Sequence, residues 1–273
     1  MVKKLFKHEF LAYVRIMSIV YLILLTVATG SRIILLFEDR SVTYRVVNTF
    51  SLITYGVSVF GALAFSFVMG IVRFYKNLFT AEGYLSFTLP VTPTQHILVK
   101  TVTAVTMSAI TFLVVLLSGC IITSGEVFAE IWKAAVFLLE RVYRQIGFHS
   151  VLAFVELLLL LILMLTVETM LYFACIAIGQ MFRKNRILAA VGAYFVYYII
   201  NQVISTIFVV AYTALAGTEA FAEFIMKLFH FIKDHPYVFT HSCVWFFIVV
   251  YALFVLVEFI IIKRIITRKL NLE

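Results

Sequence analysis

The sequence is poor in charged residues, and this shortage excludes most classes of soluble protein. Only 13% of its 273 residues are charged, while 64% are hydrophobic. A soluble domain is roughly a quarter charged and about half apolar, and a core of this size could not hide so much apolar surface from water. The Lys and Arg residues behind the net charge of +8 stand in short groups at the ends of apolar runs. They form no basic face of the kind that binds nucleic acid, so we expect a lipid bilayer, and no nucleic acid, as the surroundings.

Motifs for catalysis and for metal binding are also missing from the sequence. There is no GxxxxGK[ST] pattern, so the chain cannot hold nucleotide phosphates in a P-loop, and there is no HExxH or GxSxG. The three cysteines form no CxxC pair and are interpreted as small buried hydrophobic residues. His230, His235 and His241 have a spacing that matches no standard site. We therefore expect no catalytic residue, no metal site and no enzymatic activity in this chain.

Six long apolar runs dominate what is present. About 20 apolar residues are needed to cross a bilayer as a helix. We predict an all-α polytopic membrane protein with one membrane domain over residues 1–273 and six transmembrane helices, at about 16–37, 49–72, 101–123, 151–181, 187–212 and 242–262. More Lys and Arg residues fall in the connections on the side of the N-terminus. By the positive-inside rule, both termini are expected to be cytoplasmic.

Three segments outside these runs have helical periodicity. Residues 1–15 place Phe6, Phe10 and Tyr13 on one side and most lysines on the other. This pattern is typical of an interfacial helix on the inner leaflet, although a plain basic flank would also fit. Residues 124–150 are expected either to extend the third span or to lie on the outer leaflet. Residues 219–233 form a further amphipathic piece that could dip partway into the membrane.

Polar residues inside the spans are few. Glu168, near the middle of the fourth span, is either a hydrogen-bonded structural acid or part of a substrate path. Asn201 and Gln202 in the fifth span are possible partners for interhelical hydrogen bonds. These three residues are the candidates for a translocation path or polar core. Glu156 and Glu258 lie near the ends of their spans and are most simply explained as interfacial charges.

The second span carries small residues at intervals of four, which form one stripe along the helix. They are Ser58, Ala62, Ser66 and Gly70. Such a stripe lets helix backbones approach closely in lipid. From the sequence, the stripe could face another span of this chain or a second subunit.

The connection between the second and third spans is the most structured polar segment of the chain. Thr80 can cap a short helix, with Glu82 near its positive end, and Pro90 stops it. Thr92 then caps the next helix, with Pro93 in its first position and Gln95 completing a capping box. The short helix contains Gly83, Tyr84, Leu85, Phe87 and Thr88. Its aromatic residues would suit a groove on another protein, or could merely rest on lipid headgroups.

Residues 73–100 read RFYKNLFTAEGYLSFTLPVTPTQHILVK. This segment resembles the cytoplasmic loop of small membrane permeases of type-2 ABC exporters, particularly those of Gram-positive and clostridial bacteria, whose loops commonly read KNLF-x-x-EGYL-x-FTLPV. The arrangement of the whole chain is also similar, and so is Gly179-Gln180 with Lys184-Asn185-Arg186 in the second inner loop. The resemblance implies a multi-pass protein of the bacterial cell membrane that moves an amphiphilic cargo (a peptide, lipid or drug) outward.

The resemblance also implies a set of partners. A separate ATP-binding subunit, in two copies, would bind ATP and Mg and hydrolyse the ATP, and this chain would need no cofactor. The segment 80–88 would be the coupling helix that docks into that subunit, and a second permease chain, identical or related, would complete the export path. A stand-alone secondary transporter or channel is the alternative, but it should show more intramembrane polar residues and an inverted repeat. An intramembrane enzyme would need clustered His and acidic residues within the spans.

Overall fold

The computed structural model describes residues 2–37, 41–80, 82–83, 88, 90–182 and 184–268, and within these ranges every regular element is a helix. The helices are α1 (Val2–Leu35), α2 (Val42–Phe79), α4 (Pro93–Ile122), α5 (Glu126–Ile146), α6 (Phe148–Gly179), α7 (Arg186–Ala216), α8 (Glu219–Asp234) and α9 (Pro236–Arg268). Six of them, α1, α2, α4, α6, α7 and α9, are long and apolar enough to cross a membrane. This confirms the prediction of an all-helical, multi-pass membrane protein.

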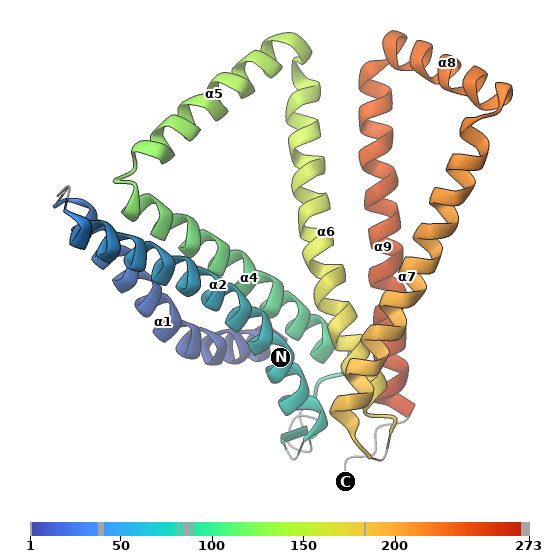
Figure 1. Ribbon diagram of the computed structural model, residues 1–273. Helices are drawn as coiled ribbons and strands as arrows, with labels where there is room; N and C mark the ends of the chain where they lie inside the picture. The colour runs from blue at the N-terminus through green and yellow to red at the C-terminus, as the bar shows by residue number, and fades with distance from the viewer. Residues whose placement is uncertain are drawn as a thin grey trace. The chain divides into compact units, whose positions relative to one another are not determined.

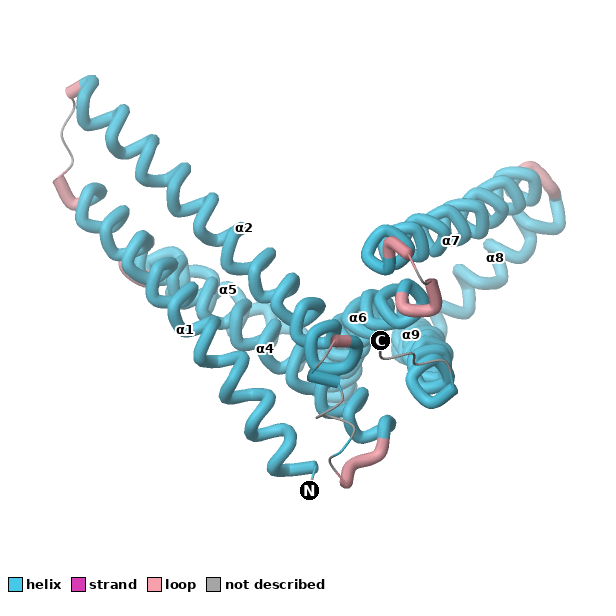
Figure 2. The backbone as a smooth tube through the Cα atoms, turned by 90° about the horizontal axis from the view of Figure 1, so that it is seen from below, coloured by secondary structure: helices cyan, strands magenta, loops and turns pink. Residues whose placement is uncertain are grey.

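The helices form two compact units, which we describe separately. Unit 1 comprises Met1–Ile146 and unit 2 comprises Gly147–Asn271. In unit 1, α1, α2 and α4 pack against one another in pairs, and α5 continues from the end of α4 after a short turn (Figures 1 and 2). In unit 2, α6 packs against α9 and α7 packs against α6, while α8 joins the far ends of α7 and α9 (Figure 1).

The packing of α1 shows what the apolar side of residues 1–15 contacts. The helix runs from Val2 to Leu35 without interruption, so the amphipathic segment and the first span are one element. Tyr13 and Met17, on its apolar side, are buried against Met107 of α4. Lys3 and Lys7, on the other side, are exposed. The apolar side therefore packs on the protein, and the contact of the basic side with the inner leaflet stays a prediction.

The small-residue stripe of α2 faces the other helices of unit 1. A Cβ atom on Gly70 would lie 3.4 Å from the Tyr13 hydroxyl and 3.6 Å from the Ala104 Cβ. The Ser66 carbonyl accepts a hydrogen bond from Tyr13, and the Ser66 hydroxyl accepts one of 2.9 Å from Thr111 of α4. Polar bonds of this kind stabilise helix pairs in lipid. Of the two arrangements that the sequence allowed, the packing shows a contact with spans of the same chain.

Unit 2 has a tight crossing where α6 ends and α7 begins. A Cβ atom built on Gly179 would lie 2.6 Å from the Arg186 carbonyl oxygen and 2.8 Å from the Ala190 Cβ. The connection includes Asn185, whose φ of 55° is left-handed, a conformation that asparagine tolerates better than most residues. Glycine is therefore the one residue at position 179 that lets the two backbones approach so closely.

The helix α5 has an apolar side without any protein cover among the described residues. Trp132 is 62% exposed, Leu138 is 58% exposed, and none of residues 126–144 of α5 is buried. Its charged residues gather on the opposite side, where Glu140 and Arg144 form an exposed pair of 3.6 Å. An amphipathic helix with a broad apolar side is stable in the plane of a membrane interface.

We expect Trp132 to lie among the acyl chains of a bilayer. In a Trp245→Phe variant Trp132 is the sole tryptophan, because the chain has 2. Its fluorescence should be quenched by phosphatidylcholine brominated near the headgroup end of the acyl chain, and little by aqueous iodide, because the apolar side of α5 would face lipid. Strong quenching by iodide together with none by the brominated lipid would contradict this placement.

Candidate functional site

The most connected polar group in unit 1 surrounds Glu9, and we call it the Glu9 cluster (Glu9, Arg73, Asn77 and Lys100). Arg73 Nη2 donates to Glu9 Oε2 at 2.7 Å. Asn77 Nδ2 and Lys100 Nζ both donate to Glu9 Oε1, at 2.8 and 2.7 Å. Both carboxylate oxygens are therefore engaged, and one side chain of α1 joins the last turns of α2 to the first turns of α4.

The Glu9 cluster is largely removed from solvent. The side chains of Lys100, Glu9 and Arg73 are 5%, 11% and 17% exposed. The Arg73 guanidinium also lies over the Tyr13 ring, 5.8 Å from its centroid, which adds a cation–π contact. Burial raises the pKa of the Glu9 carboxyl, but the charges and hydrogen bonds of Lys100 and Arg73 outweigh it and lower this pKa to about 2. Glu9 is therefore ionised and balances two buried cations.

The Glu9 cluster lies at both ends of the connection that the sequence singled out. Thr80 is the C-cap of α2, and its hydroxyl donates to the Lys76 carbonyl at 2.5 Å. The Gly83 amide donates to the Thr80 carbonyl at 2.7 Å, which turns the chain there. Glu82 and Thr88 are exposed, whereas Gly83 is buried. The remaining residues predicted for the coupling helix, Tyr84, Leu85 and Phe87, lie outside the described residues.

The start of α4 is as predicted. The Thr92 hydroxyl accepts a hydrogen bond of 3.4 Å from the backbone N–H of Gln95. The side-chain Oε1 of Gln95 accepts one of 3.1 Å from the backbone N–H of Thr92. Together with Pro93 in the first turn, these bonds form the predicted capping box. The capping box thus fixes the point where the connection ends and α4 begins. Two turns later, the hydrogen bond from Lys100 joins α4 to Glu9.

The predicted polar candidates of unit 2 are not gathered into one site by the described contacts. Glu168 is exposed, and its Oε1 accepts a long bond of 3.4 Å from Tyr172 on the same helix. Asn201 Nδ2 donates to the Tyr197 carbonyl of its own helix at 3.0 Å, and Gln202 is exposed. Tyr172 stacks on Tyr194 of α7, with ring centroids 5.6 Å apart. A role for these residues in a translocation path stays a prediction.

Sequence reasoning overlooked Glu9 and misplaced two other acids. Glu9 is the one acidic residue among the basic residues of segment 1–15, and that isolation was the available signal. Glu156 is 3% exposed and bonded to α9, so it is no simple interfacial charge. Glu258 is 5% exposed, and neither of its carboxylate oxygens has a hydrogen-bond partner in the described part of the chain. Nothing in the spacing of the acids along the chain distinguishes these three environments.

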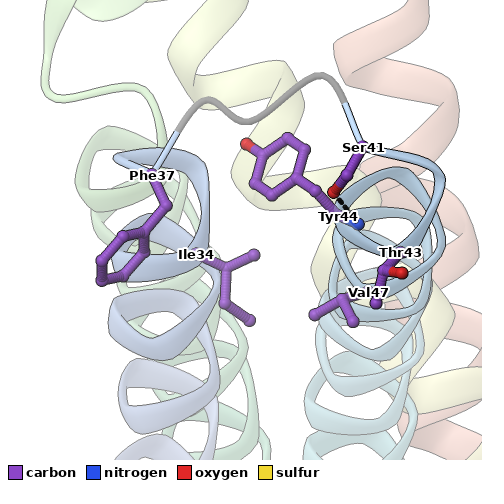
Figure 3. Close-up of a pocket in the computed structure, with 6 residues that line it drawn as sticks. All are labelled: Ile34, Phe37, Ser41, Thr43, Tyr44 and Val47. Carbon is purple, nitrogen blue, oxygen red and sulfur yellow. Dashed lines mark hydrogen bonds between the residues drawn. The ribbon is translucent and has the colours of Figure 1, made fainter.

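A pocket of about 500 Å³ lies where α1 and α2 approach each other at the far end of unit 1 (Figure 3). It is lined by Ile34, Phe37, Ser41, Thr43, Tyr44 and Val47. The Ser41 hydroxyl accepts from the Tyr44 amide at 3.2 Å and caps α2. None of these six described lining residues is charged, and we assign the pocket no function.

No family model, no curated protein and no solved structure matches the chain.

Proposed function

We propose that the chain is the membrane permease subunit of a type-2 ABC exporter in a bacterial cell membrane. It would move an amphiphilic cargo outward with energy from a separate ATP-binding subunit. The observation that carries the proposal is the segment RFYKNLFTAEGYLSFTLPVTPTQHILVK in the connection between α2 and α4. The six long apolar helices fit such a subunit, and their few polar groups suit a peptide, lipid or drug that is itself partly apolar.

The Glu9 cluster supports the proposal because it would make the connection a stiff coupling element. A displacement of the connection between α2 and α4 would be transmitted to α2 through Arg73 and Asn77. It would be transmitted to α4 through Lys100. Glu9 holds all three donors, so α1 has to move with them. Buried pairs of this kind favour two discrete arrangements over gradual bending. Closure of the ATP-binding subunits would then be passed to three helices together.

The test is retention of an ABC-type ATP-binding subunit that is co-expressed with this chain. In Tyr84→Ala plus Phe87→Ala, we expect at least about tenfold less of that subunit to co-purify, because two aromatic anchors of the proposed contact would be lost. ATP-dependent export should fall with it. Phe137→Ala plus Tyr143→Ala removes two exposed aromatic residues of α5, on the predicted outer side, and should change neither quantity.

Two results would contradict the proposal. One is equal retention and equal export in both double variants. The other is transport by the chain without any ATP-binding subunit, which would favour the secondary transporter or channel.

A further inference from the structure

A second buried polar group joins the first turns of α6 and α9, and we call it the Glu156 cluster (Glu156, His241 and Trp245). His241 Nδ1 lies 2.7 Å from Glu156 Oε2, and Trp245 Nε1 donates to Glu156 Oε1 at 2.9 Å. His241 and Trp245 are four residues apart, so they lie one above the other on the same side of α9. One carboxylate therefore ties α6 to two successive turns of α9.

The imidazole of His241 also has a titratable neighbour. The His149 ring lies 5.5 Å from the His241 ring and is stacked on Tyr237 at 5.0 Å, between ring centroids. The side chain of His241 is 17% exposed, whereas that of Glu156 is 4% exposed. Protons can therefore reach the imidazole while the carboxylate stays out of water. Among the described residues these groups do not converge as a set of metal ligands.

We propose that Glu156 and His241 form a proton-binding site that strengthens the contact between α6 and α9 when the surroundings become acidic. With a neutral imidazole, the pair holds one buried negative charge, which is costly. One added proton makes His241 an imidazolium ion, and the hydrogen bond becomes an ion pair with no net charge. Imidazole is the side chain that titrates between pH 5 and 8.

Two further titratable groups of the described residues contact this site: the His149 ring of α6 lies against the His241 ring, and it stacks on Tyr237 of α9. α8, which packs on α9, forms no hydrogen bond or ion pair with it in the described ranges. The charged and titratable residues of α8 are Glu219, Glu223, Lys227, His230, Lys233 and Asp234. α7 packs on α6, and Tyr212, in the part of α7 nearest to α8, contacts Phe221.

The proposal requires neither the partner subunit nor export, so it can fail or hold independently of the proposed function.

The first measurement uses Trp245 as the reporter. Trp132→Phe leaves Trp245 as the sole tryptophan of the chain. In buffer with a metal chelator, its emission should change in one transition when the pH is lowered from alkaline to acidic values. His241→Gln keeps a donor for Glu156 but cannot take up a proton, so the transition should disappear. It should also disappear in Glu156→Gln, and it should persist in His230→Gln, which alters an exposed histidine of α8.

The second measurement is the midpoint of unfolding in detergent at pH 6 and at pH 8. The stabilising charge is present at low pH and lost as the pH rises, so the protein with Trp132→Phe should unfold at a higher temperature at pH 6. This difference should be lost in His241→Gln and kept in His230→Gln. The proposal is overturned if neither measurement responds to pH, if both responses survive His241→Gln, or if they require His149 and not His241. It is also overturned if the emission transition appears only when the chelator is left out, which would indicate a metal.

Discussion

Glu9→Gln is expected to destabilise unit 1 by about 3–5 kcal/mol, the usual cost of removing one partner from a buried ion pair. The variant leaves Lys100, whose side chain is 5% exposed, without its counter-charge, and Arg73 loses the same partner. Glutamine keeps the size of the side chain, so the loss would come from charge and not from a cavity. Unfolding by a denaturing detergent, followed by circular dichroism, measures the effect.

A matched control for Glu9→Gln lies in the same unit. Glu140→Gln breaks an Arg pair whose side chains are 62% and 81% exposed, and such pairs contribute at most about 1 kcal/mol. Adding Lys100→Met to Glu9→Gln should recover part of the loss, because the ammonium that lacks a counter-charge is removed as well. Equal losses in Glu9→Gln and Glu140→Gln would show that the buried charges of the Glu9 cluster do not stabilise the three helices.

Gly179→Ala is expected to destabilise unit 2 by about 1–3 kcal/mol or more, as overpacking does in a close contact. The new methyl group would lie 2.6 Å from the Arg186 carbonyl oxygen and 2.9 Å from the Ala190 amide nitrogen. Both are backbone atoms, so the clash can be relieved only by moving α7 away from α6. In a Trp132→Phe background, the emission of Trp245 during unfolding reports on unit 2 alone.

Gly192→Ala is the control for this second prediction. Gly192 lies within α7, and a Cβ atom there would meet nothing within 4 Å. Alanine favours a helix over glycine by about 1 kcal/mol, so this variant should be at least as stable as the parent. If Gly179→Ala unfolded no earlier than Gly192→Ala, the close approach of α6 and α7 would be refuted.

Some parts of this structure are local and could be read from the sequence. The length and apolarity of the six spanning helices depend only on neighbouring residues. The capping box at Thr92 and Gln95 closes within three residues, and it formed as predicted. The periodicity of α1 around Tyr13 likewise identified its apolar side, although not what that side would contact. Residues 84–87, which belong to the segment that carries the family resemblance, lie outside the described residues. Their role in a coupling helix stays a prediction.

The sequence by itself therefore determined a multi-pass helical protein and the start of α4 at Thr92, whereas most of the other helices extend beyond the predicted spans. Only the tertiary structure decided that Glu9 pairs with Lys100, that Glu156 bonds to His241 and Trp245, and that Glu258 is buried with no hydrogen-bond partner among the described residues. The physical reason is distance along the chain. The partners of Glu9 and Glu156 are 64 to 91 positions away, and they meet because of how whole helices pack. An acid in an apolar helix looks the same in sequence whether its partner is an ion, a hydrogen-bond donor or nothing.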